Sequence, residues 1–206
     1  VWTCAATTDV MRWRPWATTL VVAVAGLVPA ARILRDWLMG RFTDPVDEIT
    51  LRTGWWALFF LTATLAISPV RRITGWNALI RQRRTLGLLA FTYATLHFST
   101  YIVLDQFFGW SFILEDIAER PYITVGFTAW LLLLPMALTS TRGWIRRLGK
   151  RWIALHALIY LIAGLAVLHF SWLVKADLRE PTIFGLVLAA LLAVRLLRKR
   201  RGRTPA

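Results

Sequence analysis

Six long apolar runs, separated by short charged or turn-rich segments, dominate the pattern of hydrophobic and polar positions along this chain. Each run is long enough to cross the ~30 Å hydrocarbon core of a bilayer as an α-helix. The predicted spans cover residues 16–34, 54–70, 86–104, 121–139, 152–173 and 182–197. The pattern therefore predicts an all-α membrane protein, a bundle of six transmembrane helices.

The connections between the runs are too short to hold a second domain, and none contains a Gly-rich phosphate loop. Any nicotinamide chemistry would therefore belong to another protein. The predicted organisation is an N-terminal cytoplasmic segment, a membrane domain and a basic cytoplasmic tail, over residues 1–15, 16–197 and 198–206. Residues 1–10 are expected to be an upstream extension, because Met11 opens a positively charged segment that is typical of a native start.

Basic residues are distributed unevenly among the connections. The chain carries 25 Lys and Arg against 11 Asp and Glu, a net charge of +14. Most bases follow the second, fourth and sixth spans, whereas the acids concentrate in the other three connections. Cytoplasmic loops of membrane proteins are enriched in Lys and Arg. This distribution predicts that both termini are cytoplasmic and that the first, third and fifth connections face outward.

Composition narrows the possible functions further. Of the 206 residues, 57% are hydrophobic, which is too many for a soluble domain. The bases lie in short segments rather than on one continuous face, so nucleic-acid binding is not favoured. A single cysteine excludes an internal disulfide, a cysteine-held iron–sulfur cluster and a Cys-rich zinc site. Redox chemistry would need a different carrier.

Three histidines, His97, His156 and His169, are the candidate functional residues, because each lies inside an apolar span. An imidazole in hydrocarbon is costly without a partner. Spans three and five run in the same direction, and His97 and His169 occur at similar depth toward the outer side. A haem iron bound by both residues would explain this pairing. The alternative is that each histidine hydrogen-bonds to a Ser or Thr on a neighbouring helix.

The position of His156, near the inner start of span five, predicts a second cofactor position. His156 and His169 are 13 residues apart, and a rise of ~1.5 Å per residue separates them by ~20 Å, too far for one iron. On an ideal helix this spacing turns the two side chains roughly 140° apart. For both rings to face span three, span five needs tilt or local unwinding, and Gly164 offers a place for this irregularity. The alternative is that one of the two rings has a different neighbour.

Short motifs around these histidines are dispersed over about residues 40–180. They are Asp44-Pro45, Arg52-Thr53-Gly54, Arg83-Arg84-Thr85-Leu86-Gly87, Ala94-Thr95-Leu96-His97 with Tyr101, Arg120-Pro121-Tyr122, Thr139-Ser140-Thr141, Leu148-Gly149-Lys150, Trp152, Leu155-His156, His169 and Val174-Lys175. In these motifs the chain resembles the ferric reductase and NADPH oxidase membrane domain. It resembles still more closely the MsrQ family, the haem-binding membrane subunits of bacterial methionine sulfoxide reductase systems.

The resemblance implies one haem b held by His97 and His169 and a second, inner site that retains only His156. The broader family carries two histidines on each helix, but the place 14 residues before His97 is Arg83. The inner site could hold a second haem with a different or missing sixth ligand, or FMN. Arg83 and Arg84 suit haem propionates or a flavin phosphate, because guanidinium groups pair bidentately with such anions. Setting the membrane topology is an equally suitable role for both.

The resemblance also implies a direction of electron flow. MsrQ-like proteins pass electrons from a cytoplasmic flavin reductase, or from quinol, across the bacterial inner membrane to MsrP. This periplasmic molybdopterin enzyme reduces methionine sulfoxide in oxidised envelope proteins. The implied role is an electron-transfer subunit, with the bond chemistry on its partner. The alternative is a stand-alone ferric reductase or quinol-linked cytochrome b, whereas a cofactor-free scaffold would leave the histidines unexplained.

Overall fold

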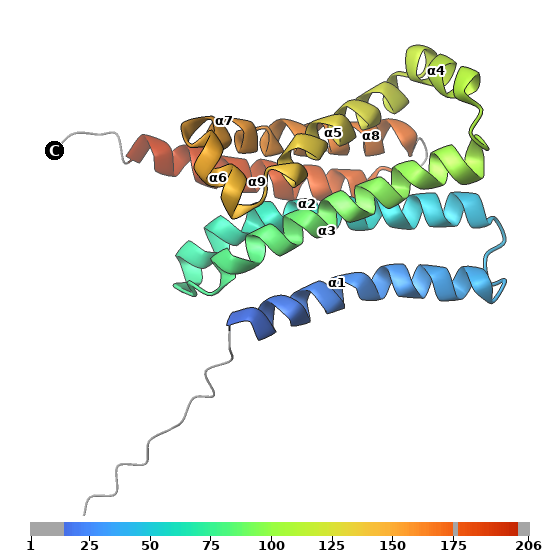
Figure 1. Ribbon diagram of the computed structural model, residues 1–206. Helices are drawn as coiled ribbons and strands as arrows, with labels where there is room; N and C mark the ends of the chain where they lie inside the picture. Colours follow the sequence, from blue (N-terminus) through green and yellow to red (C-terminus); the bar gives the residue numbers. More distant parts are fainter. Residues whose placement is uncertain (1–14, 175–176, 202–206) are drawn as a thin grey trace, which may run out of the picture.

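Helices make up nearly all of the described backbone in the computed structural model, which describes residues 15–174 and 177–201 (Figure 1). They are α1 (Pro15–Leu38), α2 (Pro45–Thr74), α3 (Leu79–Thr100), α4 (Trp110–Glu119), α5 (Pro121–Leu138), α6 (Arg142–Leu148), α7 (Lys150–Ala157), α8 (Ile159–Leu173) and α9 (Arg179–Arg201), with a π-helical turn, η1 (Tyr101–Asp105), after α3. No strand occurs in these ranges, so the all-α prediction is confirmed. The predictions for residues 1–14 and 202–206 lie outside the described residues.

Six stretches of helix are long and apolar enough to cross a membrane, which confirms the predicted number of spans. They cover Trp16–Leu38, Pro45–Thr74, Leu79–Asp105, Pro121–Leu138, Lys150–Leu173 and Arg179–Leu197. The spans alternate in direction along the bundle (Figure 1). One end, the basic end, carries the α2–α3 turn, α6, the start of α1 and the end of α9. The other, the α4 end, carries α4 and the α1–α2 turn.

Helix α2 begins nine residues before the predicted start of its span because a cap extends it beyond the apolar run. The Asp44 carboxylate accepts hydrogen bonds from the backbone N–H groups of Val46 and Asp47. Pro45 occupies the first turn, where its missing N–H is not needed. The short helices α4 and α6 lie in connections where the apolar pattern predicted no helix. The predicted tail also begins inside α9, which continues to Arg201.

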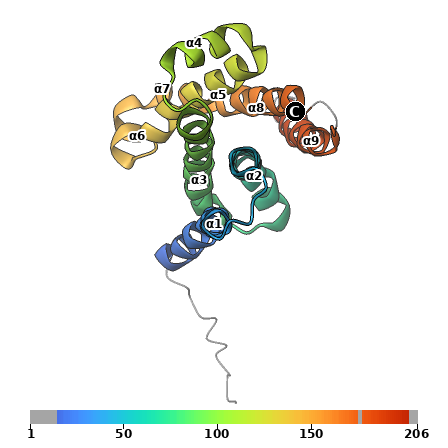
Figure 2. The same cartoon turned by 90° about the vertical axis from the view of Figure 1, so that its right-hand side faces the viewer.

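Four helices, α2, α3, α5 and α8, provide most of the core of the bundle (Figure 2), and α9 adds Phe184 and Leu188. Among the helix pairs, α2 packs most extensively on α3, and α5 on α8. The completely buried positions include small and large side chains, such as Ala90, Tyr93, Ile162 and Ala163. Helix α1 packs outside α3, and α9 packs against α8 and α2. Two helical hairpins therefore enclose the space in which a buried site can form.

Span five contains the irregularity that the histidine spacing required, but the prediction that it occurs at Gly164 is wrong. Helix α8 runs through Gly164 without interruption. The break lies at Leu158, between α7 and α8, where the Leu158 N–H bonds to the carbonyl of Leu155, only three residues earlier. Such a tight turn overwinds the chain locally. No atom lies within 4 Å of a Cβ built on Gly164, so packing does not demand a glycine there.

Helix α1 is attached to the core through the buried hydroxyl of Tyr93. This hydroxyl accepts a hydrogen bond from the Ala30 N–H at 2.9 Å and donates one to the Gly26 carbonyl at 2.8 Å. Pro29 lies beside these groups and interrupts the backbone hydrogen bonds of α1, because a proline has no N–H to donate. The Tyr93 hydroxyl therefore stabilises a backbone segment that the proline has weakened.

Substitution Tyr93→Phe is expected to lower the stability of the α1 attachment by about 1–3 kcal/mol, because buried backbone groups lose their partner. Thermal unfolding of the detergent-solubilised chain, followed by circular dichroism, measures this loss. Tyr160→Phe is the control, since the described contact of Tyr160 is made by its ring with Arg195. Equal midpoints for the two variants would show that the Tyr93 hydroxyl bonds contribute nothing.

Candidate functional site

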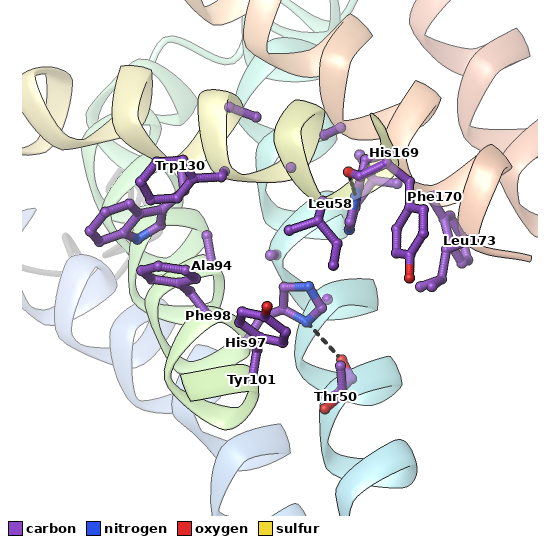
Figure 3. Close-up of a pocket in the computed structure, with 18 of the residues that line it drawn as sticks. Thr50, Leu58, Ala94, His97, Phe98, Tyr101, Trp130, His169, Phe170 and Leu173 are labelled. Atoms are coloured by element: carbon purple, nitrogen blue, oxygen red, sulfur yellow. Dashed lines mark hydrogen bonds between the residues drawn. The ribbon is translucent and has the colours of Figure 1, made fainter. Parts of the chain in front are cut away.

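A cavity of about 350 Å³ lies between the two core hairpins (Figure 3). Its lining includes Asp105 and Arg120, which lie at the α4 end of the bundle. His97 on α3 and His169 on α8 both line it, and their ring centroids are 6.0 Å apart. The space exists because glycines and alanines from all four core helices line the cavity. They are Gly54, Ala57, Ala90, Ala94, Gly126, Ala129 and Ala166.

Backbone carbonyls determine which nitrogen of each ring carries the proton. Nδ1 of His97 lies 2.9 Å from the Thr50 carbonyl oxygen, and Nδ1 of His169 lies 2.7 Å from that of Tyr122. A carbonyl oxygen can only accept a hydrogen bond, so Nδ1 of each neutral ring donates and Nε2 keeps its lone pair. This is the form in which histidine binds metals, and the carbonyl increases the basicity of the ligand.

The spacing of the two rings fits an iron porphyrin. A metal–imidazole bond is about 2 Å long and the ring centroid lies about 1 Å further, so two imidazoles on one metal have centroids roughly 6 Å apart. Aromatic side chains in the cavity wall, among them Phe98, Trp130 and Phe170, provide apolar surface for a macrocycle. Within residues 15–174 and 177–201, no three His, Cys, Asp or Glu side chains gather to bind a metal ion directly. Two imidazoles at this spacing, in a cavity with aromatic walls, fit a haem.

Polar groups line the cavity at the α4 end. Asp47, Asp105 and Arg120 contribute there, next to Tyr101. Nε of Arg120 pairs with a carboxylate oxygen of Asp116 at 3.0 Å, and the Tyr101 hydroxyl donates to the other oxygen at 3.0 Å. Hydrogen bonding to Tyr122 and the charge of Asp116 raise the pKa of Arg120. The rim is therefore charged, whereas the interior of the cavity is apolar.

His156 lies apart from this pair, toward the basic end. Its Nε2 is 3.2 Å from the Thr139 hydroxyl, which itself donates to the Pro135 carbonyl at 2.7 Å. The hydroxyl proton is thus engaged, so Nε2 of His156 donates. The ring stacks on Trp152 with centroids 4.0 Å apart. This is the hydrogen bond to a neighbouring threonine that the sequence offered as the alternative to haem, and here only His156 makes it.

Comparisons with known proteins identify the relatives of this chain. Residues 53–167 match the family described as ferric reductase like transmembrane component. A protein of Xanthomonas oryzae pv. oryzae, named protein-methionine-sulfoxide reductase heme-binding subunit MsrQ, is 53% identical over 194 residues, covering 91% of this chain and 88% of its own. A protein of Rhodospirillum rubrum with the same name is 49% identical over 209 residues, covering 96% and 98%. The chain belongs to the MsrQ family. Both resemblances inferred from the motifs are confirmed.

Of the two arginines that the MsrQ resemblance singled out, the structure brings Arg83 toward His156. Arg83 is half-buried on α3, within electrostatic range of His156, whereas the Arg84 side chain is exposed. Arg195 on α9 also lies in range of Arg83, and its guanidinium packs 4.6 Å over the Tyr160 ring. The sequence analysis missed Arg195, although an arginine inside an apolar span is itself a signal.

The partners of the two paired histidines were also missed. Thr50 and Tyr122 act through backbone carbonyls, which leave no side-chain signature in a sequence. Gly54 and Tyr122 belong to motifs that the chain shares with the MsrQ family, but those motifs alone assigned them no role. A signal was nevertheless present, because each histidine follows its carbonyl partner by the same 47 residues.

Proposed function

We propose that this chain is the haem-binding, electron-transferring membrane subunit of a methionine sulfoxide reductase system. The observation that carries the proposal is the pair of imidazoles in one cavity, each with Nδ1 bound to a carbonyl and Nε2 available to a metal. His97 and His169 would hold a haem b, whose iron exchanges single electrons. The chain's own residues orient the two ligands and surround the site with apolar side chains, which govern the potential of the iron.

A second cofactor position at the basic end belongs to the same proposal. His156 and Arg83 would contribute to it, with the exposed Arg84 at its edge, and it would take a second haem b or FMN. An iron ligand at Nε2 requires His156 to release Thr139, whereas a flavin leaves that hydrogen bond intact. Two positions ~20 Å apart along the bundle would divide the membrane into steps short enough for electron transfer. Quantifying haem and flavin per chain separates the two possibilities.

The distribution of charge supports a proposed orientation, and membership of the MsrQ family supports the proposed partners. We propose that the basic end faces the cytoplasm of a bacterium, with both termini on that side of the inner membrane. A cytoplasmic flavin reductase, or quinol, would deliver electrons at this end. The α4 end, with acidic residues such as Glu115 and Asp116, would face the periplasmic molybdopterin subunit MsrP, where methionine sulfoxide is reduced.

Electron transfer across a sealed membrane tests the proposal. The purified full chain is reconstituted into liposomes that enclose ferricyanide, and NADH, flavin and a flavin reductase are added outside. We expect enclosed ferricyanide to be reduced through the wild-type chain but not through His97→Ala, because only the former keeps both iron ligands. A rate equal to that of protein-free vesicles, or a purified chain without haem absorption, contradicts the proposal.

The same vesicles distinguish the alternative function. With MsrP and methionine sulfoxide enclosed in place of ferricyanide, an MsrQ-type subunit supports sulfoxide reduction. A stand-alone ferric reductase instead reduces an enclosed ferric chelate efficiently and transfers no electrons to MsrP.

A further inference from the structure

The two halves of the cavity wall share one sequence pattern. Residues 94–99, Ala-Thr-Leu-His-Phe-Ser, reappear 72 positions later as residues 166–171, Ala-Val-Leu-His-Phe-Ser, with five of six residues identical. The same shift relates 24 of the 28 residues that line the cavity, in twelve pairs such as Leu61 with Leu133. The hairpin of α2 and α3 and the hairpin of α5 and α8 therefore contribute equivalent positions.

The repeat includes the immediate surroundings of both histidines. The carbonyl partners, Thr50 and Tyr122, are 72 residues apart, and each is followed four residues later by a glycine, Gly54 or Gly126. A Cβ built on Gly54 would lie 3.1 Å from Nδ1 of His97. A Cβ built on Gly126 would lie 2.7 Å from Nδ1 of His169. The His97 ring on α3 thus lies against Gly54 of α2, and the His169 ring on α8 lies against Gly126 of α5.

Helix geometry explains why a glycine is needed at these places. The carbonyl of residue i in an α-helix points along the axis toward residue i+4, whose side chain leans back over the same turn. A side chain at i+4 therefore flanks that carbonyl and obstructs a second donor approaching from outside the helix. With glycine at i+4, the carbonyl remains open to the Nδ1–H of an imidazole from the neighbouring helix.

We propose that Gly54 and Gly126 are positioning residues for the two axial ligands, each exposing the carbonyl that holds its histidine in the metal-binding tautomer. This inference rests on the proposed haem-binding function and deepens it. The four α-helices would form two copies of one ligand-presenting unit. The haem would be held by two equivalent devices rather than by two unrelated histidines.

The test uses Gly54→Ala and Gly126→Ala in the purified full chain. Gly164→Ala is the matched control, because it lies on α8 within five residues of His169 and has no neighbour within 4 Å of its Cβ. Haem per chain, the low-spin ferric electron paramagnetic resonance signal and the midpoint potential are measured. We expect Gly126→Ala to lose most of the low-spin signal and Gly54→Ala to raise the potential of a retained haem. A histidine without its carbonyl partner is a weaker donor to ferric iron.

Signals and potentials in both variants that match those of Gly164→Ala, at normal haem content, would overturn the positioning role while leaving the proposed function intact. Absence of haem from wild type and Gly164→Ala would overturn both.

A second measurement needs no glycine substitution and stays decisive if Gly54→Ala or Gly126→Ala fails to fold. The chain has three histidines, so ¹⁵N-histidine labelling yields a simple spectrum of the diamagnetic ferrous chain. The inference requires that Nδ1 is protonated in the rings of His97 and His169. The signals that disappear in His156→Ala belong to His156, so the remaining signals belong to these two rings. The inference is contradicted if Nδ1 of either ring is unprotonated. It is also contradicted if the Nδ1 proton exchanges with water as freely as that of an imidazole without a hydrogen-bond partner.

Discussion

Replacing either His97 or His169 by alanine is expected to abolish the low-spin haem signal of the α4-end cavity, whereas His156→Ala leaves that signal in place. Each of the paired rings offers a lone pair at Nε2 to one cavity, so loss of either leaves an iron with one protein ligand. His156 is hydrogen-bonded to Thr139 outside that cavity. Visible spectra of the reduced chain, electron paramagnetic resonance and haem quantification measure the effect.

The comparison among the three substitutions supplies its own control, since all three remove one imidazole from the same bundle. A general loss of folding would reduce haem in every variant, and circular dichroism with gel filtration identifies that case. If His156→Ala alone removes all haem, the pairing of His97 with His169 is wrong. If His156→Ala removes half of the haem and the remaining signal is unchanged, the inner position holds a second haem rather than FMN.

The membrane architecture could be predicted from the sequence because one physical constraint, crossing the hydrocarbon, acts on every residue of a span. That constraint produces apolar runs of ~20 residues, which can be counted directly. Helix ends beyond the bilayer obey other rules. The extension of α2 depends on the cap at Asp44, and α4 is a helix of 10 residues, too short to span a bilayer. Neither feature enters a count of apolar residues.

The site could be predicted in part, for a related reason. A histidine in an apolar span is conspicuous, and equal depth on parallel helices was sufficient to pair His97 with His169. Backbone carbonyls have no residue type, so Thr50 and Tyr122 could not be identified as their partners. The duplicated Leu-His-Phe-Ser segment does indicate that the two histidines have equivalent surroundings, because its shift of 72 residues also aligns Gly54 with Gly126.

The inner histidine shows where the repeat and the family pattern diverge. The 72-residue shift aligns His156 with Arg84, whereas the spacing of the broader family places the missing histidine at Arg83. The structure has Arg83 near His156 and Arg84 exposed. The tight turn at Leu158 occurs in only one of the two hairpins, so their inner halves are no longer equivalent. The duplication therefore relates the surroundings of His97 and His169 closely, and those of His156 and Arg84 poorly.

Filling the cavity is expected to exclude haem while stabilising the chain that lacks it. Ala94 and Ala166 are equivalent in the repeat, and both line the cavity between the two histidines' helices. In the double variant Ala94→Leu/Ala166→Leu, the added groups compete with the macrocycle, at a cost of about 1–3 kcal/mol for overpacking. That cost corresponds to haem binding weakened by roughly 5- to 150-fold. In the haem-free chain the same groups occupy empty space and add apolar contacts, so its unfolding temperature rises.

The opposite signs of the two effects make this prediction specific to the cavity. Haem titration of the purified chain measures the affinity, and thermal unfolding of the haem-free chain in detergent measures the stability. Ala190→Leu is the matched control, because Ala190 is exposed on α9 and the same change there affects neither quantity. A double variant that binds haem as tightly as Ala190→Leu would show that the cofactor does not occupy the space between His97 and His169. A double variant that loses haem and stability together would show only that the core had been disrupted. The single variants Ala94→Leu and Ala166→Leu, each of which adds half of the volume, then decide whether the cofactor occupies this space.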